Sequence, residues 1–129
     1  MKQDLIYPEL SYKLNGIFYQ VHNALGRFRT EKQYADFIEK LLKKYKIKYL
    51  REYELSNLGK DRGKGNRVDF VIENKILVDV KAKKFITKDD YFQMRRYLDV
   101  AKMKLGLIVN FRNTYLKPKR VLNPNIKIY

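Results

Sequence analysis

The sequence predicts an α/β protein with a mixed central sheet flanked by helices, and three patterns support this class. Apolar residues recur at helical spacing in three stretches of the chain. Short apolar runs of strand length lie between and after these stretches. The nearly continuous apolar run from Leu105 to Phe111 is typical of a central, buried strand. The predicted order is two helices, three strands, a helix and a strand, with one or two further strands in the C-terminal tail.

The two N-terminal helices have recognisable ends in the sequence. Pro8 is favoured at a first helical position, and Gly26 is a suitable stop for the helix that begins there. Thr30 is a good N-cap for the second helix, and Gln33 completes a capping-box pattern three residues later. We therefore expect one helix from Pro8 to the residue before Gly26 and another directly after Thr30.

Three strands are expected next. The first runs from roughly Lys48 to Leu55, and strict alternation would place Tyr49, Tyr53 and Leu55 on one face. The second and third cover residues 67–72 and 76–81, and a short turn at residues 73–75 joins them.

That turn decides which charged side chains meet. If the strands form an antiparallel hairpin with a loop centred on Asn74, Asp69 lies directly across from Asp79. Asp79 and Lys81 share a strand face with Leu77, because side chains alternate with a period of two. A register shift of one residue would separate the two aspartates.

A third helix and a short tail complete the predicted fold. Thr87 is the N-cap of this helix, with Asp90 at its third position. Its inward face is expected to carry Tyr91, Met94, Leu98 and Ala101. One or two edge strands are expected around residues 121–122 and 126–128.

Composition and charge limit the classes of function. At 129 residues the chain is expected to form one domain, residues 1–129, with a substantial core. The net charge of +15 predicts a polyanionic partner, with nucleic acid first and an anionic membrane surface second. No apolar stretch has the length of a membrane span, and no signal peptide is recognised. The absence of cysteine excludes disulfides, thiolate zinc sites and a cysteine nucleophile, and it suits a cytoplasmic protein.

Charged residues on the two apolar strands 67–72 and 76–81 are the principal candidates for chemistry. Charged side chains among so many apolar residues raise the free energy of the folded state unless they bind a ligand or an opposite charge. Asp69, Asp79 and the carbonyl of Val80 offer oxygen ligands of the kind that Mg²⁺ takes. Lys81 would orient an attacking water or stabilise a pentavalent phosphate, and it can act as a base if its pKa is depressed. The competing interpretation is a structural salt-bridge cluster.

Glu31, Gln93 and His22 are secondary candidates. Glu31 follows the N-cap, where the helix dipole alone favours a glutamate. It also lies one turn before Tyr34, on the side of the helix expected to face the core, from which a carboxylate could reach the sheet rim. Gln93 is either a solvated helical residue or a hydrogen-bond partner of the catalytic lysine, water or phosphate. His22 is expected to be a packed histidine at the core edge.

Basic residues cluster near these candidates and are expected to contact a nucleic-acid backbone, although each alone is most often a solvated charge. One group lies in and after the glycine-rich segment at residues 57–66, which lacks the spacing of a nucleotide-binding P-loop. The other follows the third strand. The candidates are Lys60, Arg62, Lys64, Arg67, Lys83, Lys84, Lys88, Arg95 and Arg96.

Asp69 followed by Asp79-Val80-Lys81 resembles the signature of the PD-(D/E)XK nuclease superfamily. Within it, the chain is similar to the small proteins called GxxExxY. The resemblance covers most of the chain, in the segments at residues 7–12, 21–26, 31–34, 67–71, 78–82, 93–98 and 104–111. Phe28 replaces the glycine that opens the GxxExxY motif, and Val68 replaces the proline before the first aspartate.

The resemblance implies a restriction-endonuclease-like αβββαβ core and metal-dependent nuclease chemistry. It assigns Asp69, Asp79 and Glu31 to the metal, Lys81 to catalysis and Gln93 to a supporting role. Tyr34 matches the tyrosine of the helical motif. The expected cofactor is Mg²⁺ or Mn²⁺.

The sequence thus predicts a metal-dependent nuclease that acts on DNA, with a structure-selective role in repair, recombination or defence as one option. One alternative is a catalytically inactive nucleic-acid-binding module of the same fold. Another is a protein-interaction module, since acidic proteins also suit a basic chain. A homodimer would match the symmetry of a duplex.

Overall fold

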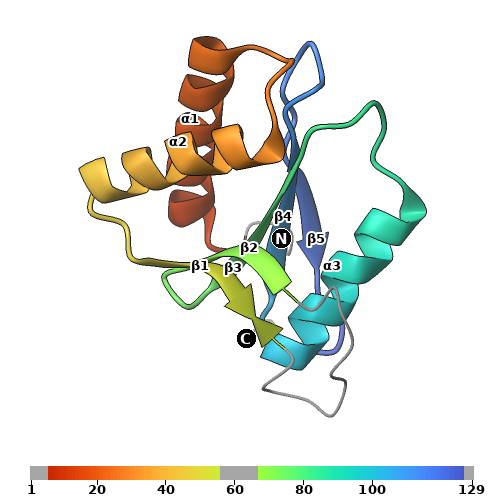
Figure 1. Ribbon diagram of the computed structural model, residues 1–129. Helices are drawn as coiled ribbons and strands as arrows, with labels where there is room; N and C mark the ends of the chain where they lie inside the picture. Colours follow the sequence, from red (N-terminus) through yellow and green to blue (C-terminus); the bar gives the residue numbers. More distant parts are fainter. Residues whose placement is uncertain (1–5, 56–66, 127–129) are drawn as a thin grey trace.

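The structure, a computed structural model, describes residues 6–55 and 67–126 and contains a five-stranded mixed sheet with helices on both faces (Figure 1). The α/β class and the predicted element order are confirmed. Of the two expected tail strands, the first is confirmed as β5 (Lys119–Leu122); Ile126 lies in no strand, and residues 127 and 128 lie outside the described residues. Lys60, Arg62 and Lys64 lie outside the described residues.

The elements are α1 (Pro8–Leu25), α2 (Glu31–Lys44), β1 (Tyr49–Glu54), β2 (Arg67–Ile72), β3 (Ile76–Lys81), α3 (Lys88–Ala101), β4 (Leu105–Asn110) and β5 (Lys119–Leu122).

The sheet combines an antiparallel meander with one parallel crossover. Its strand order is β1-β2-β3-β4-β5, with β1, β2 and β3 antiparallel in sequence. The chain then crosses through α3, so that β4 runs parallel to β3, while β5 returns antiparallel. The carboxyl ends of β3 and β4 therefore meet at one edge of the sheet, where ligands of open α/β sheets commonly bind.

The helix ends follow the predicted signals. Pro8 stands at the start of α1, and Gly26 ends it with a φ of 78°. At the start of α2, the Thr30 side chain accepts a hydrogen bond from the Gln33 N–H, and the Gln33 side chain accepts one from the Thr30 N–H. Thr87 and Asp90 form the same reciprocal cap on α3.

Two hydrophobic clusters hold the helices against the sheet. The cluster beneath α1 and α2 includes Phe18, Tyr34, Ile38, Phe70, Val80 and Phe111. The cluster beneath α3 includes Val71, Leu77, Met94, Leu98 and Ile108. Because Leu77 packs against α3, alternation along β3 also directs Asp79 and Lys81 to the α3 face.

The prediction that Tyr49, Tyr53 and Leu55 share one face is wrong. Tyr49 packs with the α1–α2 cluster, whereas Tyr53 and Leu55 pack with the α3 cluster. Glu52 between them has a φ of 52°, a conformation that breaks the extended alternation of a strand. The start of β1 therefore faces one layer and its end faces the other.

Tyr34 has a structural role in fixing the loop between α1 and α2. Its ring stacks on Phe111 with a centroid distance of 4.3 Å. Its hydroxyl donates to the Gly26 carbonyl and accepts from the Arg29 N–H. Phe28, which replaces the motif glycine in this loop, has no positive φ and so needs no glycine.

We expect Tyr34→Phe to lower the free energy of unfolding by about 1–2 kcal/mol, because the Gly26 carbonyl loses its donor. Thermal unfolding should show a fall in Tm of roughly 3–8 °C. Tyr12→Phe is the matched control, since Tyr12 is 80% exposed and should tolerate the change. Equal melting temperatures for Tyr34→Phe and the wild type would contradict this role.

Within residues 6–55 and 67–126, no helix combines the length and hydropathy that a bilayer span requires.

Candidate active site

The strands β2 and β3 part from each other where the two candidate aspartates lie. Ladder pairing between them runs from Ile72–Ile76 to Phe70–Val78, while β2 still pairs with β1 as far as Arg67. The register confirms the hairpin centred on Asn74, and its next step sets Asp69 opposite Asp79. We call this opening between β2 and β3 the fork.

Where the β2–β3 ladder stops, the side chain of Asp69 accepts the hydrogen bond that the β2 backbone would accept in a continuous ladder. Its Oδ2 accepts a hydrogen bond of 2.6 Å from the Val80 N–H. The N–H and C=O of one strand residue face the same neighbour, so the Val80 carbonyl is also directed toward the β2 side. The Lys81 carbonyl accepts from the Phe111 N–H on the opposite, β4 side, as this alternation requires.

Lys81 lies between two carboxylates. Its Nζ is 3.6 Å from Asp79 Oδ2 and 3.8 Å from Asp90 Oδ1. Asp90 in turn forms an ion pair with Lys83, while its Oδ2 accepts from the Thr87 N–H. Asp90 thus caps α3 and also holds the Lys81 ammonium.

The electrostatics of the fork follow from burial and from two like charges at close range. Burial, then the neighbouring Asp79, raises the pKa of Asp69 to about 6, against the lowering effects of the Val80 N–H and Lys81. Burial also raises the pKa of Asp79, although Lys81 and hydrogen bonds from Asp69 oppose the shift. For Asp90, burial acts to raise the pKa, but hydrogen bonds from Lys83 and Thr87 outweigh it and lower the pKa.

Sequence reasoning missed three residues of the site: Asp90 in this role, Tyr97 and Asn110. Burial, then the charge of Asp79, raises the pKa of the Tyr97 hydroxyl to about 12. Asn110 is buried at the end of β4, in register with Lys81. Asn110 could have been recognised from the sequence, because it is the polar residue in the otherwise apolar run from Leu105 to Phe111. The sequence around Asp90 indicated only a helix cap.

Asn110 connects the two loops at the carboxyl ends of β3 and β4. Its side-chain oxygen accepts from the Lys83 N–H at 3.1 Å, and its Nδ2 donates to the Lys83 carbonyl at 2.7 Å. The same oxygen accepts from the Arg112 N–H. Further along this loop, His22 Nε2 donates to the Asn113 carbonyl at 2.9 Å, which agrees with the expected packed histidine.

Among the described residues, neither Glu31 nor Gln93 makes a hydrogen bond or ion pair with Asp69, Asp79 or Lys81. Glu31 is exposed at the first position of α2, and the prediction that it faces the core is wrong because the inward stripe begins at Tyr34. No contact among the described residues joins Glu31 to either aspartate of the fork. Gln93 lies half-buried on α3, one turn after Asp90, and makes no side-chain hydrogen bond to another described residue.

The basic candidates that the structure describes have different environments. Arg67 lies 3.8 Å from Glu52, and both are exposed. Lys83 is neutralised by Asp90. Arg95 is half-buried. Lys84, Lys88 and Arg96 are exposed as well.

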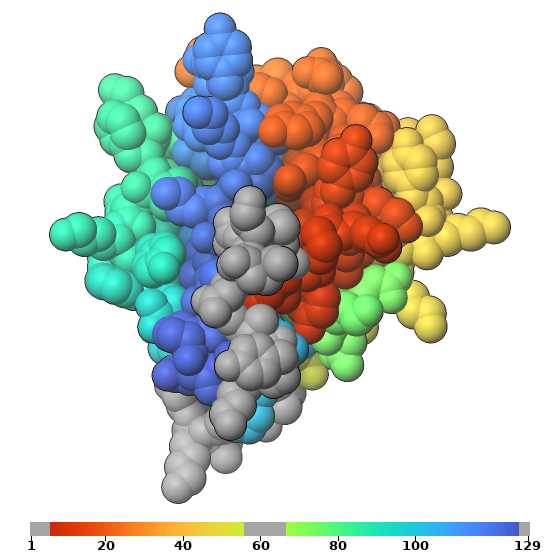
Figure 2. All heavy atoms as spheres, turned by 180° about the vertical axis from the view of Figure 1, so that it is seen from behind, coloured from red at the N-terminus to blue at the C-terminus, as the bar shows by residue number. Residues whose placement is uncertain are grey.

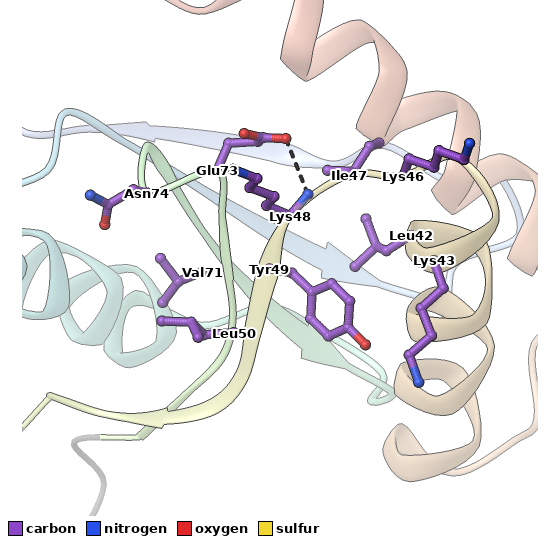
Figure 3. A pocket seen from close by; sticks show the side chains of 10 residues that line it. All are labelled: Leu42, Lys43, Lys46, Ile47, Lys48, Tyr49, Leu50, Val71, Glu73 and Asn74. Atoms are coloured by element: carbon purple, nitrogen blue, oxygen red, sulfur yellow. Dashed lines mark hydrogen bonds between the residues drawn. The ribbon is translucent and has the colours of Figure 1, made fainter.

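A larger hollow, lined by described residues, lies at the other end of the sheet, beside the turn between β2 and β3 (Figure 3). It has a volume of about 890 Å³, and Glu73 beside it accepts a hydrogen bond of 3.1 Å from the Lys48 N–H. Its lining includes Leu42, Lys43, Lys46, Tyr49 and Leu50. Choosing the site by volume alone would therefore favour this hollow over the fork.

The donor set of the fork fits a hard divalent cation. Among the described residues, no group of three or more histidines, cysteines and acids is arranged to hold a metal. The fork instead offers the carboxylates of Asp69 and Asp79 and the Val80 carbonyl. Mg²⁺ is commonly held by one or two carboxylates, with water completing its coordination. A cation there would also relieve the repulsion between the two buried carboxylates.

The mixed sheet, the parallel crossover and the D…D-x-K fork define a restriction-endonuclease-like fold. The comparison with family models agrees: the model of the PD-(D/E)XK nuclease superfamily matches residues 8–121. The chain belongs to this superfamily, which indicates a nuclease that hydrolyses phosphodiester bonds of nucleic acid. Searches of curated proteins and of solved structures returned no match. The narrower likeness to the GxxExxY proteins stays a prediction.

Proposed function

We propose that this protein is a metal-dependent nuclease that cuts DNA at the fork between β2 and β3. The observation that carries the proposal is the meeting of Asp69, Asp79 and Lys81, with Lys81 Nζ 3.6 Å from Asp79 and the Val80 N–H bonded to Asp69. Hydrolysis of a phosphodiester requires an activated water and neutralisation of the charge that develops on the phosphate. Paired carboxylates and an ammonium supply the side chains for both tasks.

Each residue has a distinct proposed role. Asp69, Asp79 and the Val80 carbonyl would hold Mg²⁺ or Mn²⁺, which when bound would supply a Lewis acid and lower the pKa of water. Lys81 orients the nucleophilic water and stabilises the negative charge on the phosphate. Asp90 is a positioning residue, because it holds the Lys81 ammonium from the opposite side.

Two assignments from the resemblance remain part of the proposal. Glu31 would supply a further metal ligand from the exposed start of α2. Gln93 would support Lys81 or the phosphate from α3, since it lies one turn after Asp90. The exposed Lys84, Lys88 and Arg96 would contact the nucleic-acid backbone. A homodimer and a cytoplasmic location also stay predictions.

The direct test is cleavage of a panel of labelled DNA and RNA structures, with Mg²⁺, with Mn²⁺ and with chelator. The wild type should cut DNA only when a divalent cation is present. Lys81→Met, which keeps the aliphatic stem, should lower the cleavage rate by about 10²-fold through loss of the ammonium. Lys75→Met at the far end of the hairpin is the matched control and should retain the wild-type rate.

The same panel separates the nuclease from a non-catalytic nucleic-acid-binding module. Wild-type protein that binds DNA but cuts no substrate with either metal would support the binding module. Cleavage that Lys81→Met leaves unchanged would show that the reaction takes place elsewhere.

A further inference from the structure

A second, smaller hollow lies on the same sheet face as Asp79 and Lys81. Its volume is about 250 Å³. It lies between the segment before α3 and the segment before β5, which border each other at one end of the molecule (Figure 2). We call it the Lys84–Lys119 groove; its lining residues are Lys84, Phe85, Ile86, Ile108, Asn110, Asn113, Lys117 and Lys119.

The groove adjoins the fork through the register of the sheet. Asp79 pairs with Ile108 of β4, and Ile108 pairs with Lys119 of β5, so the three form one row. Neighbouring strands are about 4.8 Å apart, which places the Lys119 backbone about 10 Å from that of Asp79.

The chemistry of the groove suits a polyanion that carries flat apolar rings. Lys84, Lys117 and Lys119 are exposed, and none of them forms an ion pair with a described acidic residue. Among the described residues, no carboxylate lines the groove. Phe85 is 71% exposed beside these lysines, and Ile108 contributes an apolar floor. The neighbouring Lys83 differs, because Asp90 already neutralises it.

The hydrogen bonds of Asn110 hold the two walls of the groove together. They join the Lys83 backbone on one wall to the Arg112 backbone that leads to the other. A preformed groove loses little conformational entropy when a ligand binds. The segment that carries Phe85 is therefore fixed at Lys83 by these hydrogen bonds.

We propose that the Lys84–Lys119 groove binds an unpaired stretch of nucleic acid that leads away from the phosphate at the fork. One base stacks on Phe85, while Lys84, Lys117 and Lys119 neutralise the phosphates around it. Stacking on an exposed ring requires an unpaired base, because a duplex keeps its bases in its own stack. This inference rests on the proposed nuclease function and narrows the substrate to nucleic acid with a single-stranded segment beside the cut.

The test is binding without metal, so that cleavage plays no part. Fluorescence anisotropy with chelator compares a labelled oligothymidylate with a labelled duplex of the same length. Lys84→Ala/Phe85→Ala should weaken binding of the single strand by about tenfold, the effect of losing one stacked base, and weaken duplex binding less. Tyr12→Ala/Lys13→Ala is the matched control, because it removes an exposed aromatic and a lysine on α1, across the sheet.

The opposite wall provides a second variant. Lys117→Ala/Lys119→Ala should reduce the slope of log affinity against log salt for the single strand by about 0.7 for each phosphate that the variant no longer neutralises. Thermal melts check that every variant is folded. Equal losses of affinity for single strand and duplex, or equal losses for groove and control variants, would overturn the proposal.

The outcome for the groove can be distinguished from the outcome for the proposed nuclease activity. A groove effect in a protein that cuts no substrate would refute the nuclease activity and retain the groove. Metal-dependent cutting by a protein that shows no groove effect would refute the groove alone.

Discussion

Asp79→Asn is expected to lower metal-dependent cleavage by about 10³-fold while leaving the protein folded. Asp79 is 4% exposed, and its carboxylate is one of two that would hold the cation. Loss of a charged metal ligand removes several kcal/mol of charge stabilisation in the transition state. Because each 1.36 kcal/mol changes a rate tenfold, a loss of about 4 kcal/mol gives the stated factor.

The same substitution should keep or raise the melting temperature of the metal-free protein. Burial raises the pKa of Asp79, which means that its charged form is disfavoured in the folded state. A neutral amide of the same shape avoids this cost. Single-turnover cleavage and thermal unfolding of the same preparation measure the two effects together. A variant that unfolds, or one that still cuts at the wild-type rate, would contradict the assignment.

Asp36→Asn is the matched control, and it is expected to change the melting temperature in the opposite direction. Hydrogen bonds from Lys32 and Arg51 lower the pKa of Asp36, so its charged form is favoured in the folded state. Its replacement should therefore lower the melting temperature slightly at neutral pH. Cleavage should be unchanged, because Asp36 lies on α2 and pairs with β1 rather than with the fork.

The second large effect expected is a loss of cleavage in acid, centred near pH 6. The pKa of Asp69 is raised to about 6, chiefly by burial and then by Asp79. A metal ligand must be deprotonated, so the competent fraction falls about tenfold for each pH unit below this value. Near pH 4 the rate should be roughly 100-fold below its value at pH 8. Because saturating metal would itself displace the proton from Asp69, rates at a fixed metal concentration below saturation would measure the profile. A flat profile under those conditions would contradict it.

The stability of the metal-free protein should change in the opposite direction. The folded pKa of Asp69 lies above the ordinary aspartate value of 3.8, so folding favours the protonated form. This contribution is present below about pH 4 and is lost as the pH rises toward 6. The loss is at most about 3 kcal/mol. Urea unfolding of the wild type and of Asp69→Asn should show a stability difference that changes between pH 4 and 7, and added Mg²⁺ should restore the wild type only at the upper end.

The pairing at the fork was predictable from the sequence because it depends on a short hairpin. Glu73 and Asn74 both adopt positive φ in the turn, which centres the loop where the spacing of the two strands predicts it. Once that loop is placed, the period of two along each strand brings Asp69 and Asp79 together. No distant part of the chain is needed for this step.

The neighbours of Lys81 depend on contacts between distant elements. Asp90 reaches Lys81 only because the crossover packs the first turn of α3 over the end of β3. Helical spacing predicted that Asp90 caps a helix but carried no information about the strand it would meet. The exposure of Glu31 is a similar case, since its helix was predicted correctly but its distance from the fork depends on how α2 packs.

The sequence by itself determined the helices with their caps, the α/β class and the facing aspartates, because each depends on local periodicity or on a turn of a few residues. The tertiary structure alone decided that β2 and β3 part at Asp69, that Asp90 and Lys81 meet, and that Ile108 and Lys119 extend a row from Asp79 across the sheet. The physical reason is range: these contacts arise only when helix packing and strand order bring together residues far apart in the chain.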